Sequence, residues 1–144
     1  MQIRPLAGGV PTALLVLVFA SFAAAQTSAP EISFTVAMPR PHTHLFDIEV
    51  AVKRGPTITV PAQEQLLMPV WTPGSYLVRE FERHVQDFAA TDAAGQPLKW
   101  EKINKNTWRV MTGGAREWRA KYQVYANELS VRTSELNSNH AFWN

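Results

Sequence analysis

Two histidines separated by one residue are the first candidates for chemistry in this sequence. His42 and His44 would point to the same side of an extended segment, and a pair of imidazoles can begin a metal site. A catalytic zinc needs three protein ligands and one open position, and no third ligand stands at a diagnostic spacing. We therefore interpret the pair as polar groups that hydrogen-bond to backbone and water, and we predict no metal ligand in this chain.

The densest group of charged residues lies in the stretch from Met68 to Phe88, MPVWTPGSYLVREFERHVQDF. It contains one histidine, whereas H-E-x-x-H and H-x-x-E-H each place two histidines on one helical turn. Its four central charges are instead predicted to form surface or interface ion pairs, each worth about 0–1 kcal/mol. They are Arg79, Glu80, Glu82 and Arg83.

Other catalytic signatures are incomplete. Ser75 follows a glycine but lacks the G-x-S-x-G elbow, the carboxylates show no pairing for glycoside chemistry, and the glycines form no phosphate loop. The chain has no cysteine, which excludes disulfides, thiol nucleophiles and cysteine zinc sites. We predict no catalytic or cofactor-binding residue in this chain, and substrate-binding residues stay unassigned.

Five tryptophans could form a platform for a carbohydrate or a peptide. In a strand-rich chain of this size a core role is favoured, because each indole buries a large apolar area. They are Trp71, Trp100, Trp108, Trp118 and Trp143.

Short alternating segments separated by turn signals are expected to position these side chains. Strands are predicted at residues 31–38, 45–53, 57–60, 75–81, 84–91, 98–102, 107–111 and 116–127. Turns are predicted at residues 54–56, 72–75, 92–95, 104–106 and 112–114. A bend or bulge is expected near Glu82 and Arg83. The pattern favours an all-β fold, an antiparallel β-sandwich or a curved, saddle-like sheet, preceded by a signal-peptide helix.

Alternation also predicts which side chains face the core. In the first strand these are Ile32, Phe34, Val36 and Met38, which makes that strand half-buried. In the last strand they are Trp118, Ala120, Tyr122, Val124 and Ala126. Residues 77–88 also fit a short helix, but a strand is favoured because the segment follows a turn and is rich in valine and aromatic residues.

The N-terminal 25 residues are predicted to be a signal peptide. Arg4 supplies the positive charge, residues 13–25 form an apolar run, and three alanines at 23–25 fit the cleavage rule, so the mature chain would begin at Gln26. A membrane anchor is the alternative, but the run is shorter than the roughly 20 residues that cross a bilayer. Residues 26–30 are then a linker and residues 31–144 one β-domain, exported to the periplasm or out of the cell.

The charge balance gives no sign of a nucleic-acid partner. The net charge is +2 without a basic block, so no nucleic-acid partner is expected.

The end of the sequence differs from the strands before it. Alternation ends after residue 127, and the sequence finishes on Phe142, Trp143 and Asn144. We interpret this end as cut within an element, and we expect both aromatic side chains to be exposed.

Several segments together resemble one family. Residues 68–88 resemble the most recognisable segment of the N-terminal domain of the glycyl aminopeptidase family of zinc metallopeptidases. The family's order is kept by PHTH at residues 41–44 with Phe46, by Trp100 with KNTWRV at 105–110, and by YQVYANELSVRT at 122–133. The resemblance therefore covers nearly all of the mature chain.

The resemblance implies a parent enzyme that is larger than this chain. Family members carry a thermolysin-like catalytic domain that holds zinc through H-E-x-x-H and a downstream glutamate, and usually a PDZ-like domain. None of those positions occurs here, so the chain is expected to be a fragment that packs on the catalytic domain and helps to shape the cleft for a peptide substrate. It would be inactive alone. The alternative is a stand-alone secreted β-sandwich that binds peptide or glycan through its tryptophans.

Overall fold

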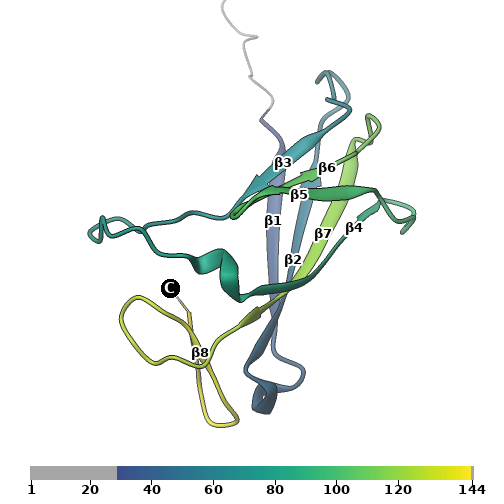
Figure 1. Cartoon of the computed structure of the whole chain (residues 1–144). Coiled ribbons are helices and arrows are strands. Elements are labelled where there is room, and N and C mark those ends of the chain that lie inside the picture. The colour runs from purple at the N-terminus through teal and green to yellow at the C-terminus, as the bar shows by residue number, and fades with distance from the viewer. Residues whose placement is uncertain (1–28, 144) are drawn as a thin grey trace, which may run out of the picture.

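The computed structural model describes residues 29–143, so the predicted signal peptide lies outside the described residues. The fold is antiparallel and nearly all β, as predicted (Figure 1). The larger sheet has the order β1-β2-β7-β4, formed by Glu31–Ala37, Leu45–Lys53, Glu117–Tyr125 and Val85–Asp92. The smaller sheet has the order β3-β6-β5, formed by Glu64–Leu67, Thr107–Val110 and Trp100–Asn104.

Shorter elements complete the chain. A two-stranded hairpin near the C-terminus pairs β8 (Glu135–Leu136) with β9 (Ala141–Phe142). Within the described residues, single-turn 3₁₀ helices form at η2 (Pro41–Thr43) and η3 (Phe81–His84). Within residues 29–143 no helix has the length and apolar character that a membrane span requires.

One face of the larger sheet is apolar across three neighbouring strands. Because side chains alternate along a strand, the register decides which of them share a face. The antiparallel pairing of β2 with β7 places Val50 beside Ala120 and Val52 beside Trp118. The opposite face is polar: Glu49 forms ion pairs with Arg119 and Lys121.

The smaller sheet covers one end of this apolar face. Trp118 is 1% exposed there, and Val50, Val52, Ala120 and Val110 are buried with it. Partly buried side chains that pack against this cluster are Ile48, Leu66, Phe88, Leu98 and Tyr122. The inward residues predicted for the strand at 116–127 are thus confirmed. Trp118, Ala120 and Ala126 are buried, and Tyr122 and Val124 are half-buried and pack against the buried clusters.

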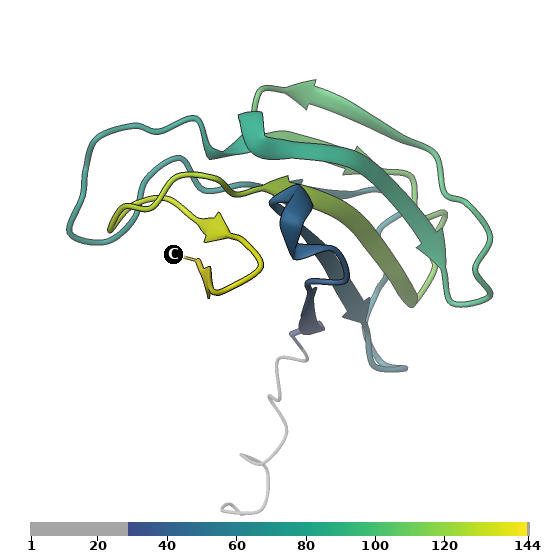
Figure 2. The same cartoon turned by 90° about the horizontal axis from the view of Figure 1, so that it is seen from below.

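The C-terminal hairpin covers the other end of the face. Leu136 is 1% exposed and packs with Phe46 and Ala126 in a second, smaller core. The larger sheet is curved, and the C-terminal segment lies within its curve (Figure 2). The described chain after residue 127 is therefore packed onto the domain through the buried Leu136, although its sequence shows no strand alternation.

Strand β1 departs from the prediction. It forms as expected, but all seven of its residues are exposed, so it is not half-buried. Ile32 is 51% exposed and Phe34 is 68% exposed, and Val36 and Met38 are exposed too. The smaller sheet does not extend over this edge strand, which leaves its apolar side chains without a second layer.

Two other predicted strands are wrong. Residues 57–60 form a turn and coil, and residues 75–81 are irregular, with only Ser75 in an isolated bridge. The helical alternative at 77–88 is reduced to η3, which replaces the bend expected near Glu82. The bulge lies instead between Gln86 and Ala89, where Asp87 has a φ of 53°.

The predicted turns are confirmed where side chains or glycine determine them. Asp92 Oδ1 accepts hydrogen bonds from the backbone N–H groups of Ala94 (2.9 Å) and Gln96 (2.8 Å). Gly95 takes a φ of 80° in the same turn. An Asp that bonds to its own backbone and a glycine in the left-handed region are both local signals, so tertiary context was not needed to find this turn.

Candidate interaction surface

The stretch from Met68 to η3 begins with a well-defined turn. The Ser75 N–H donates to the Thr72 carbonyl at 3.0 Å, and Gly74 has a φ of 83°, which fits the type II turn predicted there. The Arg79 N–H donates to the Val70 carbonyl at 2.6 Å and closes the base of the loop. Ser75 is thus a turn residue in the structure.

Residues 70–80, named here the projecting loop, extend away from the sheets (Figure 1). Its apolar side chains lie open to solvent: Trp71, Tyr76, Leu77 and Val78. The rings of Trp71 and Tyr76 contact each other with centroids 5.8 Å apart. The base of the loop is held by Asn106, whose side-chain amide donates to the Met68 carbonyl at 2.8 Å. The loop therefore presents an apolar tip on a fixed base.

The four charged residues of this stretch do not pair with one another as predicted. Glu80 pairs instead with Lys105, a contact that brings together residues 25 positions apart. This hydrogen bond, and then the charge of Lys105, lower the pKa of Glu80. Both side chains are largely exposed, so the pair contributes little to stability.

Arg83 contacts its neighbour His84. The Arg83 Nε donates to the His84 Nε2 at 3.1 Å. A guanidinium can only donate, so this nitrogen of His84 must be an unprotonated acceptor. Burial, and then the positive charge of Arg83, lower the pKa of His84, in agreement with a neutral ring.

Glu82 is buried, which the sequence did not predict. It is 5% exposed, and its Oε2 has no hydrogen-bond partner. The Arg79 Nε is likewise buried without a partner. The two polar atoms belong to the same stretch but no ion pair joins them, so the expected cluster is divided into exposed and buried parts.

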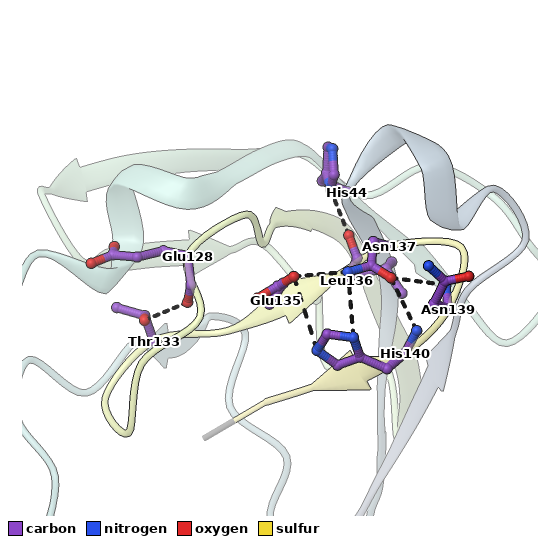
Figure 3. Close-up of polar contacts among 8 residues, drawn as sticks. All are labelled: His44, Glu128, Thr133, Glu135, Leu136, Asn137, Asn139 and His140. Carbon is purple, nitrogen blue, oxygen red and sulfur yellow. Dashed lines mark hydrogen bonds and ion pairs between the residues drawn. The ribbon is translucent and has the colours of Figure 1, made fainter.

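The two candidate histidines have structural surroundings. His44 has a φ of 59° at the end of η2, and its Nδ1 donates to the Leu136 carbonyl (Figure 3). His42 is exposed on η2. Within residues 29–143 no three His, Asp or Glu side chains are grouped so that they could hold a metal ion. His44 thus ties the start of β2 to the C-terminal hairpin.

The tryptophans divide between core and surface. Trp108 and Trp118 are buried, as predicted, whereas Trp71, Trp100 and Trp143 are exposed. Each exposed indole contacts a different ring: Tyr76, Phe88 and Phe46, respectively. Phe142 and Trp143 are both exposed, as predicted.

A large recess lies on the apolar face of the larger sheet and is named here the apolar hollow. Its volume is about 780 Å³. Strands β1, β2 and β7 contribute apolar floor residues, namely Phe34, Val36, Phe46, Ile48, Tyr122 and Val124. The wall comes from three further segments of the chain. They contribute Met68, Pro69 and Thr72; Phe81 and His84; and, after β7, Asn127, Glu128, Arg132, Thr133, Ser134 and Trp143. The hollow therefore combines parts of the chain that are far apart in sequence.

A smaller and more polar recess of about 400 Å³ adjoins it. Phe81, His84, Glu128 and Thr133 line both recesses, so the two lie side by side. The smaller recess adds the charged side chains of Arg79, Glu80 and Arg83. The surface thus has an apolar floor and a charged margin, and the margin is formed by the stretch that looked most like a site in the sequence.

Hydrogen bonds hold the wall of the hollow in place (Figure 3). Thr133 Oγ1 donates to the Glu128 carbonyl at 2.6 Å and closes one loop. The Asn137 Oδ1 accepts from the N–H groups of Asn139 (2.8 Å) and His140 (3.0 Å), and its amide donates to Glu135 at 2.8 Å. These local bonds explain how a segment without alternation keeps a defined shape.

The fold and this surface define a class: a two-sheet antiparallel β-domain with a large apolar recess and, among the described residues, no metal-binding group. The model of the peptidase M61 N-terminal domain matches residues 33–144. The chain belongs to this family. The comparison with curated proteins gives no match.

A solved structure is similar to this chain. It is an aminopeptidase N family protein from Idiomarina loihiensis, with 32% sequence identity and a TM-score of 0.70. The match covers 79% of this chain and 18% of that one. The chain therefore corresponds to less than a fifth of its structural neighbour.

Sequence reasoning missed the apolar hollow and the burial of Glu82. One signal for the hollow was present, because the apolar alternation of β1 continues that of β2 and β7. The strands predicted at 98–102 and 107–111, which fall in the smaller sheet, are shorter than the predicted strands that form the larger sheet. No local signal marked Glu82, since its burial depends on neighbours that are distant in sequence.

Proposed function

We propose that the chain is the N-terminal domain of an exported, zinc-dependent aminopeptidase of the glycyl aminopeptidase type. In this proposal the catalytic domain is thermolysin-like, a PDZ-like domain accompanies it, and both lie outside this chain. The present domain packs on the catalytic domain and helps to shape the cleft that receives the peptide. The family match over residues 33–144 carries the proposal.

The distribution of chemistry over the chain supports this division of labour. The described residues offer no metal-holding group, and the ring of His44 is engaged in a hydrogen bond with the Leu136 carbonyl. Zinc would therefore be held by residues of the catalytic domain, where it would activate the attacking water. The role left for this domain is to pack on the catalytic domain and to help enclose the peptide substrate.

The projecting loop is the segment best suited to shape a cleft. Trp71, Tyr76, Leu77 and Val78 are exposed on a loop whose base is fixed by Asn106. Exposed apolar side chains on a fixed loop are costly unless another surface covers them. In the assembled enzyme they would form an apolar wall beside the substrate.

The proposal is tested by comparing this chain with the polypeptide encoded by the whole gene. The whole polypeptide should hydrolyse aminoacyl substrates, and a zinc chelator should abolish the activity. The 144-residue chain should show no hydrolysis and bind no stoichiometric zinc. Chelator-sensitive cleavage by the 144-residue chain would contradict the proposal. Export is checked separately by the mass of the mature protein, which should begin at Gln26.

The alternative of a stand-alone module that binds peptide or glycan rests on the exposed indoles. Trp71 with Tyr76 is the pair of exposed rings best placed for such a contact. This function would give saturable quenching of tryptophan fluorescence by a peptide or a glycan, and Trp71→Ala would remove it. A gene that ends at residue 144 and a saturable ligand would together favour the module over the enzyme domain.

A further inference from the structure

The apolar face of the larger sheet is wider than the layer that covers it. In the β1–β2 register, Ile32 pairs with Val52 and Phe34 pairs with Val50. Val52 and Val50 are buried, whereas Ile32 is 51% exposed and Phe34 is 68% exposed. Residues that are direct neighbours on one face thus differ sharply in exposure, because the second layer ends between β2 and β1.

The uncovered side chains belong to an inward face. The residues of β1 that point to the other face are small or polar, Ser33, Thr35 and Ala37. On the next strand that outer face carries Asp47 and Glu49, which bond to Gln123 and Lys121. The larger sheet therefore has one polar, solvent-facing side and one apolar side. The side chains of β1 alternate in the same way, but no second layer packs on its apolar side.

The uncovered area is hollowed, so it suits a projecting segment of a partner better than a flat partner surface. The apolar hollow has a volume of about 780 Å³ and is walled by residues from three separate segments. Its margin carries His84, Glu128 and Arg132. An apolar floor inside a polar margin is the usual anatomy of a protein–protein interface.

The geometry points to the apolar hollow, and above all to its exposed floor residues Phe34 and Val36, as the surface on which the catalytic domain of the same polypeptide docks through an apolar segment. This inference rests on the proposed function. Trp143 lines the hollow and packs edge to face on Phe46, so a polypeptide continuing from residue 144 would begin at its margin. The solved structure that resembles this chain is a longer polypeptide, since this chain covers 18% of it. Covalent linkage would keep the docking segment at a high effective concentration beside the hollow.

Single cysteines test the docking surface, because the 144-residue chain has no thiol of its own. Phe34→Cys reports on the hollow. Thr35→Cys is the matched control, since it lies next in the same strand, is exposed, and points to the opposite face. Val36→Cys is a second probe of the hollow. Each variant is made in the 144-residue chain and in the whole-gene polypeptide, and the rate of maleimide labelling at that site is followed by peptide mass spectrometry.

Docking should slow labelling of Phe34→Cys and Val36→Cys by at least about tenfold in the whole polypeptide, which is equivalent to about 1.4 kcal/mol of protection. Labelling of Thr35→Cys should stay within about twofold of its rate in the 144-residue chain. Equal labelling of both faces in an active, chelator-sensitive polypeptide would overturn the docking surface and leave the proposed function standing. Protection of Thr35→Cys alone would do the same.

Two further outcomes separate the remaining possibilities. A whole polypeptide without chelator-sensitive activity would overturn the proposed function, and the docking inference with it. Protection of Phe34→Cys in the 144-residue chain alone, increasing with protein concentration and matched by a dimer in sedimentation, would assign the hollow to a second copy of the chain and overturn the inference. An unchanged labelling rate of Phe34→Cys in the 144-residue chain over the same concentration range excludes a second copy as the occupant. Protection in the whole polypeptide is then assigned to the catalytic domain.

Discussion

Phe34 and Val50 offer a sharp test of how far the core of this domain extends. They are direct cross-strand neighbours on the same face of the larger sheet, yet Val50 is 4% exposed and Phe34 is 68% exposed. Truncation to alanine removes apolar surface at both positions and lowers strand propensity at both. Only Val50→Ala leaves a cavity in the packed core.

The expected costs follow from burial. Val50→Ala removes two buried carbons and leaves a space beside Trp118 and Ala120, so the free energy of unfolding should fall by about 2–3 kcal/mol. About a third of the Phe34 side chain is buried, so Phe34→Ala should cost less than about 1 kcal/mol, although phenylalanine is the larger residue. The order of the two costs is the reverse of the order of side-chain size.

Urea unfolding of the 144-residue chain, followed by tryptophan fluorescence, measures both costs. Trp118 lies in the core cluster and should report loss of packing. The slope of the transition should stay unchanged if both variants lose stability without changing the compactness of the unfolded state. A cost for Phe34→Ala that equals or exceeds that of Val50→Ala would refute the reasoning, because it would mean that β1 is covered in the isolated chain.

Three further predictions concern the stretch that contains the projecting loop. Gly74→Ala should lower the free energy of unfolding by about 1 kcal/mol, because Gly74 has a φ of 83°. Gly55→Ala should leave it unchanged, because Gly55 has no positive φ and an added Cβ would meet no atom within 4 Å. Equal losses of stability in urea would contradict this. Glu82→Gln should raise stability by on the order of 1 kcal/mol, since it removes a buried charge whose Oε2 has no partner, and a fall in the thermal midpoint would count against that account. The pKa of His84 is lower in the folded chain than its ordinary value of about 6.5, so stability should be full above that pH and decline as the pH falls below it. His84→Asn should flatten this dependence of stability on pH. An unchanged dependence in the variant would show that another group titrates.

Local patterns determined most of the framework of this domain. Alternation assigned Trp118, Ala120 and Ala126 to the core face, because side chains of a strand point to opposite sides whatever lies beyond. Turns were equally predictable where the chemistry is local, as at Asp92 with Gly95 and at Gly74. The strands that failed, at 57–60 and 75–81, have no neighbouring strand with which they form a ladder.

The charged stretch shows where sequence reasoning could not reach. Proximity along the chain suggested that Arg79, Glu80, Glu82 and Arg83 would pair among themselves. The fold instead brings Lys105 to Glu80 and buries Glu82. Ion pairing depends on which side chains come within a few ångströms in space, and spacing in sequence constrains this only inside regular elements.

By itself the sequence determined the all-β class, the inward and outward faces of the long strands and the resemblance to a metallopeptidase N-terminal domain. These depend on side-chain alternation, turn chemistry and residue identity, which are properties of short segments. Only the tertiary structure decided that the second layer stops before β1, so that an apolar face predicted to be half-buried lies open. The apolar hollow results from that mismatch, because its floor of three strands and its wall of three further segments meet only when the two sheets and the C-terminal hairpin are packed.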